Sequence, residues 1–173
     1  MNPVTTSRPR PAAGPVARPA PPAPRWARTA AHVAALTPLP SALWRVALAL
    51  GFSAGYTEAG LEELDLDLVG TLWLLGLSAV TEGAALLTLV LVRPWREGMP
   101  RRVPPRWVVR AGWAGVVVLA LLWTQLAFWW HVPHDDLTPT GTTVVGLLYL
   151  PMVAWAPLLA AVTIDYRRRH RCC

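Results

Sequence analysis

Residues 69–92 read VGTLWLLGLSAVTEGAALLTLVLV, and this stretch decides the fold. It contains one ionisable side chain, that of Glu82, and Arg93 follows it directly. With a rise of about 1.5 Å per residue, a helix of this stretch would be about 36 Å long, enough to cross a hydrocarbon core of about 30 Å with some tilt. A buried helix of a soluble domain rarely lacks a polar face over such a length. The stretch therefore predicts a transmembrane helix.

The composition of the whole chain also indicates a membrane protein. Of its 173 residues, 54% are hydrophobic and 15% are charged, which is too apolar for an ordinary soluble domain of this size. All 16 basic residues are arginine, a bias typical of GC-rich coding as in actinobacteria, so we expect a bacterial protein. The formal charge of +6 would be compatible with binding to nucleic acid. The arginines, however, flank the predicted membrane spans, so we expect no nucleic-acid partner.

The predicted fold class is an all-α integral membrane bundle of four transmembrane helices within residues 41–165. The helices are expected at about 41–60, 69–92, 111–130 and 142–164. Pro151 and Pro157 interrupt the last of these, which predicts a kinked helix.

The two ends of the chain are polar. Residues 1–40 form a Pro/Ala/Arg-rich tail that we expect to be disordered, in which residues 26–36 could form a short helix lying on the membrane surface. Residues 166–173 form a basic C-terminus. Neither end contains enough apolar side chains to form a domain of its own.

The distribution of arginine predicts the orientation. Five arginines precede residue 41, six lie in the connector 93–110 and four follow residue 165, whereas the connections 57–68 and 131–141 contain none. Those two connections hold seven of the ten carboxylates. By the positive-inside rule both termini are expected in the cytoplasm, beneath a bacterial cytoplasmic membrane. Arginines beside a bilayer also favour contacts with anionic lipid head groups.

Three polar residues stand inside the predicted spans: Glu82, Arg45 and Gln125. Glu82 shares a helical face with Ser78, and we interpret it either as a protonated carboxyl in an interhelical hydrogen bond or as a proton, ion or ligand site. Arg45 is expected near the cytoplasmic end of the first helix, with its guanidinium reaching the phosphate level. A direct ion pair between Arg45 and Glu82 is a further hypothesis.

Small residues recur every fourth position in the first predicted helix. Ala47, Gly51, Gly55 and Ala59 would form one stripe that allows close approach of a second helix.

A group of potential metal ligands lies in the connection 131–141. His131, His134, Asp135 and Asp136 carry side chains that suit Zn or Cu, but Pro133 prevents their presentation on a regular helix. A polar external turn is the simpler interpretation.

The sequence gives no positive indication of an enzyme. It contains no phosphate-binding loop, nucleophile elbow or Ser/His/Asp set, and it implies no cofactor. We therefore expect a small multi-pass protein that acts as a non-catalytic accessory or interaction protein, bound to another membrane protein or to itself. The alternative is a small transporter or channel that uses Glu82 as an intramembrane proton or ion site. A membrane enzyme with an external metal site is the third hypothesis.

Overall fold

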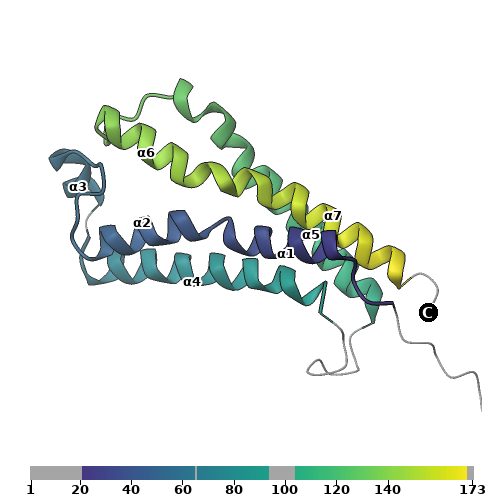
Figure 1. The fold of residues 1–173 in the computed structure, drawn as a ribbon. Helices are drawn as coiled ribbons and strands as arrows, with labels where there is room; N and C mark the ends of the chain where they lie inside the picture. The colour runs from purple at the N-terminus through teal and green to yellow at the C-terminus, as the bar shows by residue number, and fades with distance from the viewer. Residues whose placement is uncertain (1–20, 65, 94–103, 171–173) are drawn as a thin grey trace, which may run out of the picture.

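The structure, a computed structural model, describes residues 21–64, 66–93 and 104–170 (Figure 1). The predicted disordered tail lies outside these ranges as far as residue 20. Within them the fold is all-α, with one isolated β-bridge between Tyr56 and Leu137. In chain order the elements are α1 (Arg25–Leu36), α2 (Leu39–Ala49), α3 (Glu58–Leu64), α4 (Leu68–Val90), α5 (Pro105–Trp123), the 3₁₀ segment η1 (Thr124–His131), α6 (Pro139–Tyr149), the 3₁₀ segment η2 (Leu150–Ala154) and α7 (Trp155–Arg169).

Three helical runs in the described residues are long and apolar enough to cross a membrane. They are Leu68–Val90, Pro105–His131 and Pro139–Arg169. In each of the first two, 17% of the apolar window is buried inside the protein, so most of their apolar side chains face outward. Such extensive exposed apolar surface is unusual for a soluble monomer and suggests a membrane protein.

The predicted kink in the last run is confirmed. The 3₁₀ segment η2 contains Pro151 and separates α6 from α7. Proline has no N–H to donate and its ring clashes with the preceding turn, so a regular α-helix cannot pass through it unchanged. Pro157 lies in the first turn of α7, where the N–H groups have no intrahelical acceptor, and is tolerated there.

The first predicted helix, at residues 41–60, is wrong in its extent. Helix α2 ends at Ala49, and the chain then turns through Gly51, Ala54 and Gly55, which have φ angles of +89°, +49° and +96°. These left-handed conformations cannot continue a right-handed helix. The acidic segment after the turn forms the separate short helix α3.

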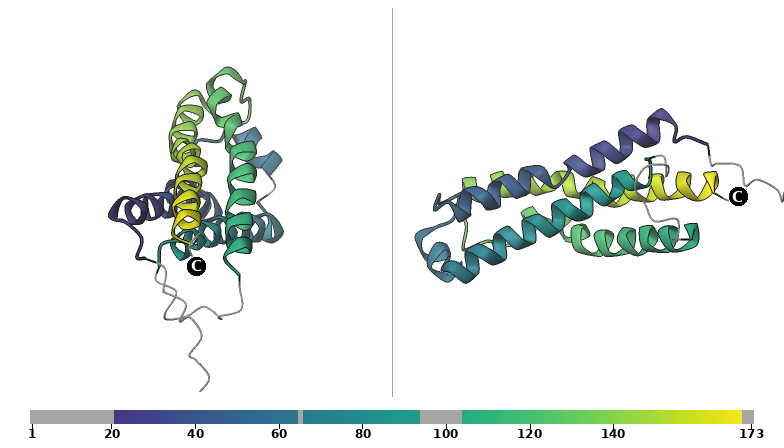
Figure 2. Two further views of the ribbon diagram at one scale, coloured as in Figure 1. Left: turned by 90° about the vertical axis from the view of Figure 1, so that its right-hand side faces the viewer. Right: turned by 90° about the horizontal axis from the view of Figure 1, so that it is seen from below.

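The helix predicted at residues 26–36 is present as α1, but it packs within the bundle. A two-residue turn at Thr37 and Pro38 separates α1 from α2, and the two helices follow one another beside α4 (Figures 1 and 2). Helix α1 also packs against α7. Its contact face is a stripe of fully buried alanines, Ala27, Ala31 and Ala34, whose small side chains allow this close approach.

The helices are antiparallel neighbours, and their ends gather at two poles. At one pole Arg169 at the end of α7 donates from Nη2 to the carbonyl of Leu91, just after α4, at 2.9 Å, and from Nε to Asp165 at 2.8 Å. At the other pole the two acidic connections bind each other. There the N–H of Thr57 donates to the carbonyl of Asp136, and that of Thr138 donates to the carbonyl of Gly55, each at 3.0 Å.

The contact between the acidic connections requires glycine. A Cβ atom added to Gly141 would lie 2.1 Å from the carbonyl oxygen of Gly55, which is backbone and cannot rotate away. Gly76, on the exposed surface of α4, has nothing within 4 Å of an added Cβ.

We expect Gly141→Ala to lower the thermal stability of the detergent-purified protein, by about 1–3 kcal/mol, because the loops must separate to admit the methyl group. The matched change Gly76→Ala should be neutral or stabilise by up to about 1 kcal/mol, since alanine is the better helix former. Thermal unfolding followed by circular dichroism measures both. Equal effects of the two substitutions would contradict the close contact.

Candidate functional site

Arg45 is the charged side chain that the structure places deepest in the bundle interior. It lies on α2 and is 3% exposed. Its partner on α4, Ser78, lies near the middle of that 23-residue helix. The expected outward extension of Arg45 is not seen: its guanidinium is directed into the bundle, where it contacts α4 and α6.

The guanidinium of Arg45 joins three helices. Its Nε donates to Oγ of Ser78 on α4 at 2.7 Å, and its Nη1 donates to the hydroxyl oxygen of Tyr149, the last residue of α6, at 3.1 Å. Ser78 in turn donates to the carbonyl of Leu74 at 3.0 Å. The third nitrogen of Arg45, Nη2, is buried without a hydrogen-bond partner among the described residues. We call Arg45, Ser78 and Tyr149 the Arg45 cluster.

Glu82 lies one helical turn beyond Ser78 on α4 but does not pair with Arg45. The ion pair that the described residues contain is the one between Arg169 and Asp165, so the hypothesis of a direct Arg45–Glu82 pair is not supported. In the part of the chain that is described, Oε1 of Glu82 is buried without a hydrogen-bond partner. Arg45 and the half-buried Glu82 thus each have one buried polar atom without a hydrogen-bond partner among the described residues.

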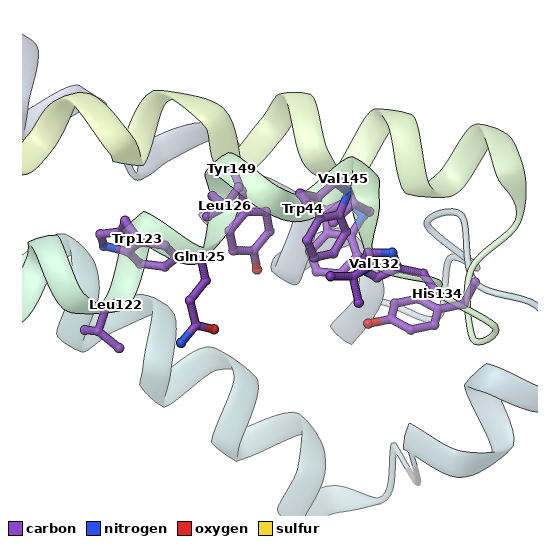
Figure 3. Close-up of a pocket in the computed structure, with 11 residues that line it drawn as sticks. Trp44, Leu122, Trp123, Gln125, Leu126, Val132, His134, Val145 and Tyr149 are labelled. Atoms are coloured by element: carbon purple, nitrogen blue, oxygen red, sulfur yellow. The ribbon is translucent and has the colours of Figure 1, made fainter.

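A cavity of about 450 Å³ adjoins the Arg45 cluster (Figure 3). Five of its lining residues are aromatic and the others are mainly aliphatic, so we call it the aromatic cavity. It is lined by Trp44, Tyr56, Leu122, Trp123, Gln125, Leu126, Trp129, Val132, His134, Val145 and Tyr149. Tyr149 belongs to both the cavity wall and the Arg45 cluster and therefore connects the two.

Ring contacts and hydrogen bonds hold the aromatic walls in place. Trp44 lies between Tyr56 and Tyr149, with ring centroids 5.8 and 5.9 Å apart, and donates from Nε1 to the carbonyl of Ala54 at 2.9 Å. Trp129 donates from Nε1 to the carbonyl of Thr142 at 2.9 Å, and its ring lies tilted against that of His134 at a centroid distance of 3.9 Å. The walls are thus fixed before any ligand enters.

The polar groups that line the aromatic cavity include those of Tyr149 and Gln125. The hydroxyl of Tyr149 and the side chain of Gln125, from η1, point to the same side in Figure 3. At the far end, burial raises the pKa of Tyr56, and the nearby charge of Asp136 and then Tyr149 raise it further. Tyr56 is therefore a neutral phenol at physiological pH.

The predicted metal site is not assembled. The described residues contain no group of three or more His, Cys, Asp or Glu side chains placed to hold a metal ion. His134 stacks on Trp129 and lines the aromatic cavity, whereas Asp135 and Asp136 line a separate hollow of about 410 Å³ together with Glu63. His131 ends η1 and is exposed. The turn between η1 and α6 thus sends these side chains in different directions.

The predicted stripe of small residues is not formed either. Ala47 lies on α2 and Ala59 on α3, while Gly51 and Gly55 lie in the turn between them. Gly55 nevertheless allows a close approach, because it touches Gly141 in the contact between the two acidic connections. Of the four predicted residues, Gly55 is thus the one for which the structure shows a close backbone contact, whereas Gly51 has nothing within 4 Å of an added Cβ and Ala59 is exposed.

No protein-family model, curated protein or solved structure matches the chain.

The structure brings two of the three predicted intramembrane polar residues to one place. Arg45 and Gln125 both neighbour Tyr149, while Glu82 stays apart on α4. Sequence reasoning missed Tyr149, because a tyrosine within an apolar stretch is common at membrane boundaries. Arg45 itself signalled that acceptors must lie nearby, since a buried guanidinium needs them, but the predicted spans hold thirteen hydroxyl side chains and the sequence does not select among them.

We expect Ser78→Ala to destabilise the protein by about 1–3 kcal/mol, because a buried guanidinium N–H loses its acceptor. In double-mutant cycles Arg45→Gln should couple with Ser78→Ala by about 0.5–3 kcal/mol, and should be additive with Glu82→Gln within about 0.5 kcal/mol. Thermal unfolding in detergent measures each variant. Strong coupling to Glu82 together with none to Ser78 would contradict the observed contacts.

Proposed function

We propose that this chain is a four-crossing protein of a bacterial cytoplasmic membrane with both termini in the cytoplasm. The three long apolar runs supply three crossings, and α1 and α2 together supply the fourth. Residues 25–49 would span about 37 Å as one helical run, enough for a hydrocarbon core of about 30 Å. The pole that carries Arg25, Arg167 and Arg168 faces the cytoplasm in this proposal, where the exposed arginines contact anionic lipid head groups.

Orientation is tested with single cysteines introduced after Cys172 and Cys173 are replaced by serine. Cysteines at Glu63 and Asp136 should react with a membrane-impermeant maleimide in intact cells, because the acidic pole faces outward. A cysteine at Arg168 should react only after the cells are opened. Labelling of position 168 from outside would overturn the proposed topology.

The function that the geometry supports best is binding of a small lipophilic molecule within the membrane. The observation that carries this proposal is the aromatic cavity beside the Arg45 cluster: a preformed, mostly apolar cavity of about 450 Å³ with a few convergent polar groups. Small-molecule sites in proteins typically have this size and this combination of surfaces. The protein would act by binding and presenting its ligand rather than by catalysis.

An uncharged ring compound, 9-methylanthracene, tests whether the aromatic cavity binds ligands at all. We expect saturable binding, seen as energy transfer from tryptophan, because Trp44, Trp123 and Trp129 line the cavity. Leu122→Trp should reduce the affinity at least about tenfold by filling the cavity.

The matched control is Val117→Trp, which changes an equally exposed residue of α5 that does not line the cavity. It should leave binding unchanged. Non-saturable binding, or equal binding by both variants, would refute the proposed function.

An accessory role in a larger membrane assembly is the second candidate. Helix α5 has none of its residues fully buried, so it presents its surface to lipid, to another membrane protein or to a second copy of the chain. A carrier role is supported by Glu82, whose buried Oε1 has no partner among the described residues, as expected of an intramembrane proton or ion site. Stoichiometric co-purification with a membrane complex would favour the accessory role. Loss of ligand uptake in the variant Glu82→Gln would favour the carrier role.

A further inference from the structure

We propose that the ligand of the aromatic cavity is a planar organic anion: a fused aromatic ring system that bears a carboxylate, with the carboxylate directed to Tyr149 and Gln125. This inference rests on the proposed function, in which the cavity binds a small molecule, and adds the chemical class of that molecule.

The hydrogen bonding of Tyr149 determines the polarity of the head group. Its hydroxyl oxygen accepts from Nη1 of Arg45 at 3.1 Å, so the hydrogen of that hydroxyl remains for another acceptor. A phenol has one such hydrogen to donate. Beside it, the amide of Gln125 offers two more N–H donors on the same side of the cavity (Figure 3). A ligand oxygen at this point would therefore accept hydrogen bonds.

The charge of Arg45 determines the charge of the head group. Its guanidinium is 3% exposed and has two hydroxyl partners, and none of the described carboxylates forms an ion pair with it. An uncompensated charge in a low-dielectric interior strongly favours a nearby group of opposite sign. A carboxylate that accepts from Tyr149 would lie one hydrogen bond beyond this charge. The carboxylates of Glu63, Asp135 and Asp136 line the separate hollow on the other side of Tyr56.

The walls determine the shape of the rest of the ligand. Aromatic rings bind flat aromatic molecules by offset stacking and edge-to-face contacts. Trp44, Trp123 and Trp129 supply large rings to the cavity wall, and no charged aspartate, glutamate, lysine or arginine side chain belongs to its lining. Aromatic walls also attract cations, but the positive charge of Arg45 behind Tyr149 opposes a cation here.

Three probes with the same ring system and different head groups test the assignment: anthracene-9-carboxylate, anthracene-9-carboxamide and anthracen-9-ylmethylammonium. Affinities are measured by tryptophan-sensitised emission on the full chain in detergent, with each value corrected for partition into empty micelles. We expect the carboxylate to bind at least about tenfold more tightly than the amide, because a hydrogen bond to a charged acceptor is stronger than one to a neutral acceptor. We expect the ammonium compound to bind most weakly of the three.

Tyr149→Phe should reduce the affinity for the carboxylate by about tenfold and change that for 9-methylanthracene less than about twofold, because the uncharged probe offers no acceptor to the hydroxyl. If Tyr149→Phe does not fold, Gln125→Leu at an exposed position makes the same test with an expected loss of about threefold. Equal affinities for the three probes, or an equal loss of affinity for both compounds in Tyr149→Phe, would overturn the inference while saturable 9-methylanthracene binding to the unchanged protein upholds the proposed function. Loss of all probe binding would refute both.

Discussion

The hydrogen bonds of Arg45 to Ser78 and Tyr149 are the interaction on which the arrangement of the bundle interior depends. Removing a guanidinium from water is costly unless its N–H groups find acceptors. Here the acceptors come from α4 and α6, so α2 satisfies its charge only when both helices lie at the correct depth. Apolar packing alone specifies such axial register poorly, because neighbouring positions of a leucine-rich helix are similar. The cluster thus fixes the relative position of three helices and places Tyr149 at the wall of the aromatic cavity.

Sequence reasoning was most successful where length and hydrophobicity decide the structure. The helix predicted at residues 69–92 is α4 at Leu68–Val90, and the proline-interrupted stretch is the α6–η2–α7 run. The extent of the helix at residues 41–60 was wrong, and the helix predicted at residues 26–36 is present but packs within the bundle, because backbone conformation and tertiary packing decide there. The spacing of Gly51 and Gly55 is equally compatible with a helix-packing stripe and with a turn. Their positive φ angles in the structure show that they form a turn. Helix α1 resembles a surface helix because its contact face is alanine, which adds little to hydropathy.

The candidate site could be predicted only in part from the sequence. Polar residues inside apolar stretches are visible in the sequence, so Arg45, Glu82 and Gln125 could be selected, whereas their distances depend on which helices are neighbours. Because α1 precedes α2 along the side of α4, Arg45 lies beside the middle of α4 rather than near one of its ends. Tyr149, the residue that connects Arg45 to the aromatic cavity, carries no charge and therefore gave no signal.

Two features of this structure oppose stability, and they occur side by side. The aromatic cavity of about 450 Å³ is open on one side, where its lining residues Leu122 and Val132 are each 56% exposed and make fewer packing contacts. Beside it, a guanidinium is buried with its Nη2 unpaired among the described residues. Natural sequences are otherwise consistent from local propensity to packing, and departures from that consistency occur mainly at functional sites. If the two destabilising features lay far apart in the structure, they would suggest imperfect packing. Here both involve Tyr149, which lines the cavity with its ring and accepts from Arg45 with its hydroxyl. A bound anion would relieve both at once, because its ring would fill the void and its carboxylate would offset the buried charge.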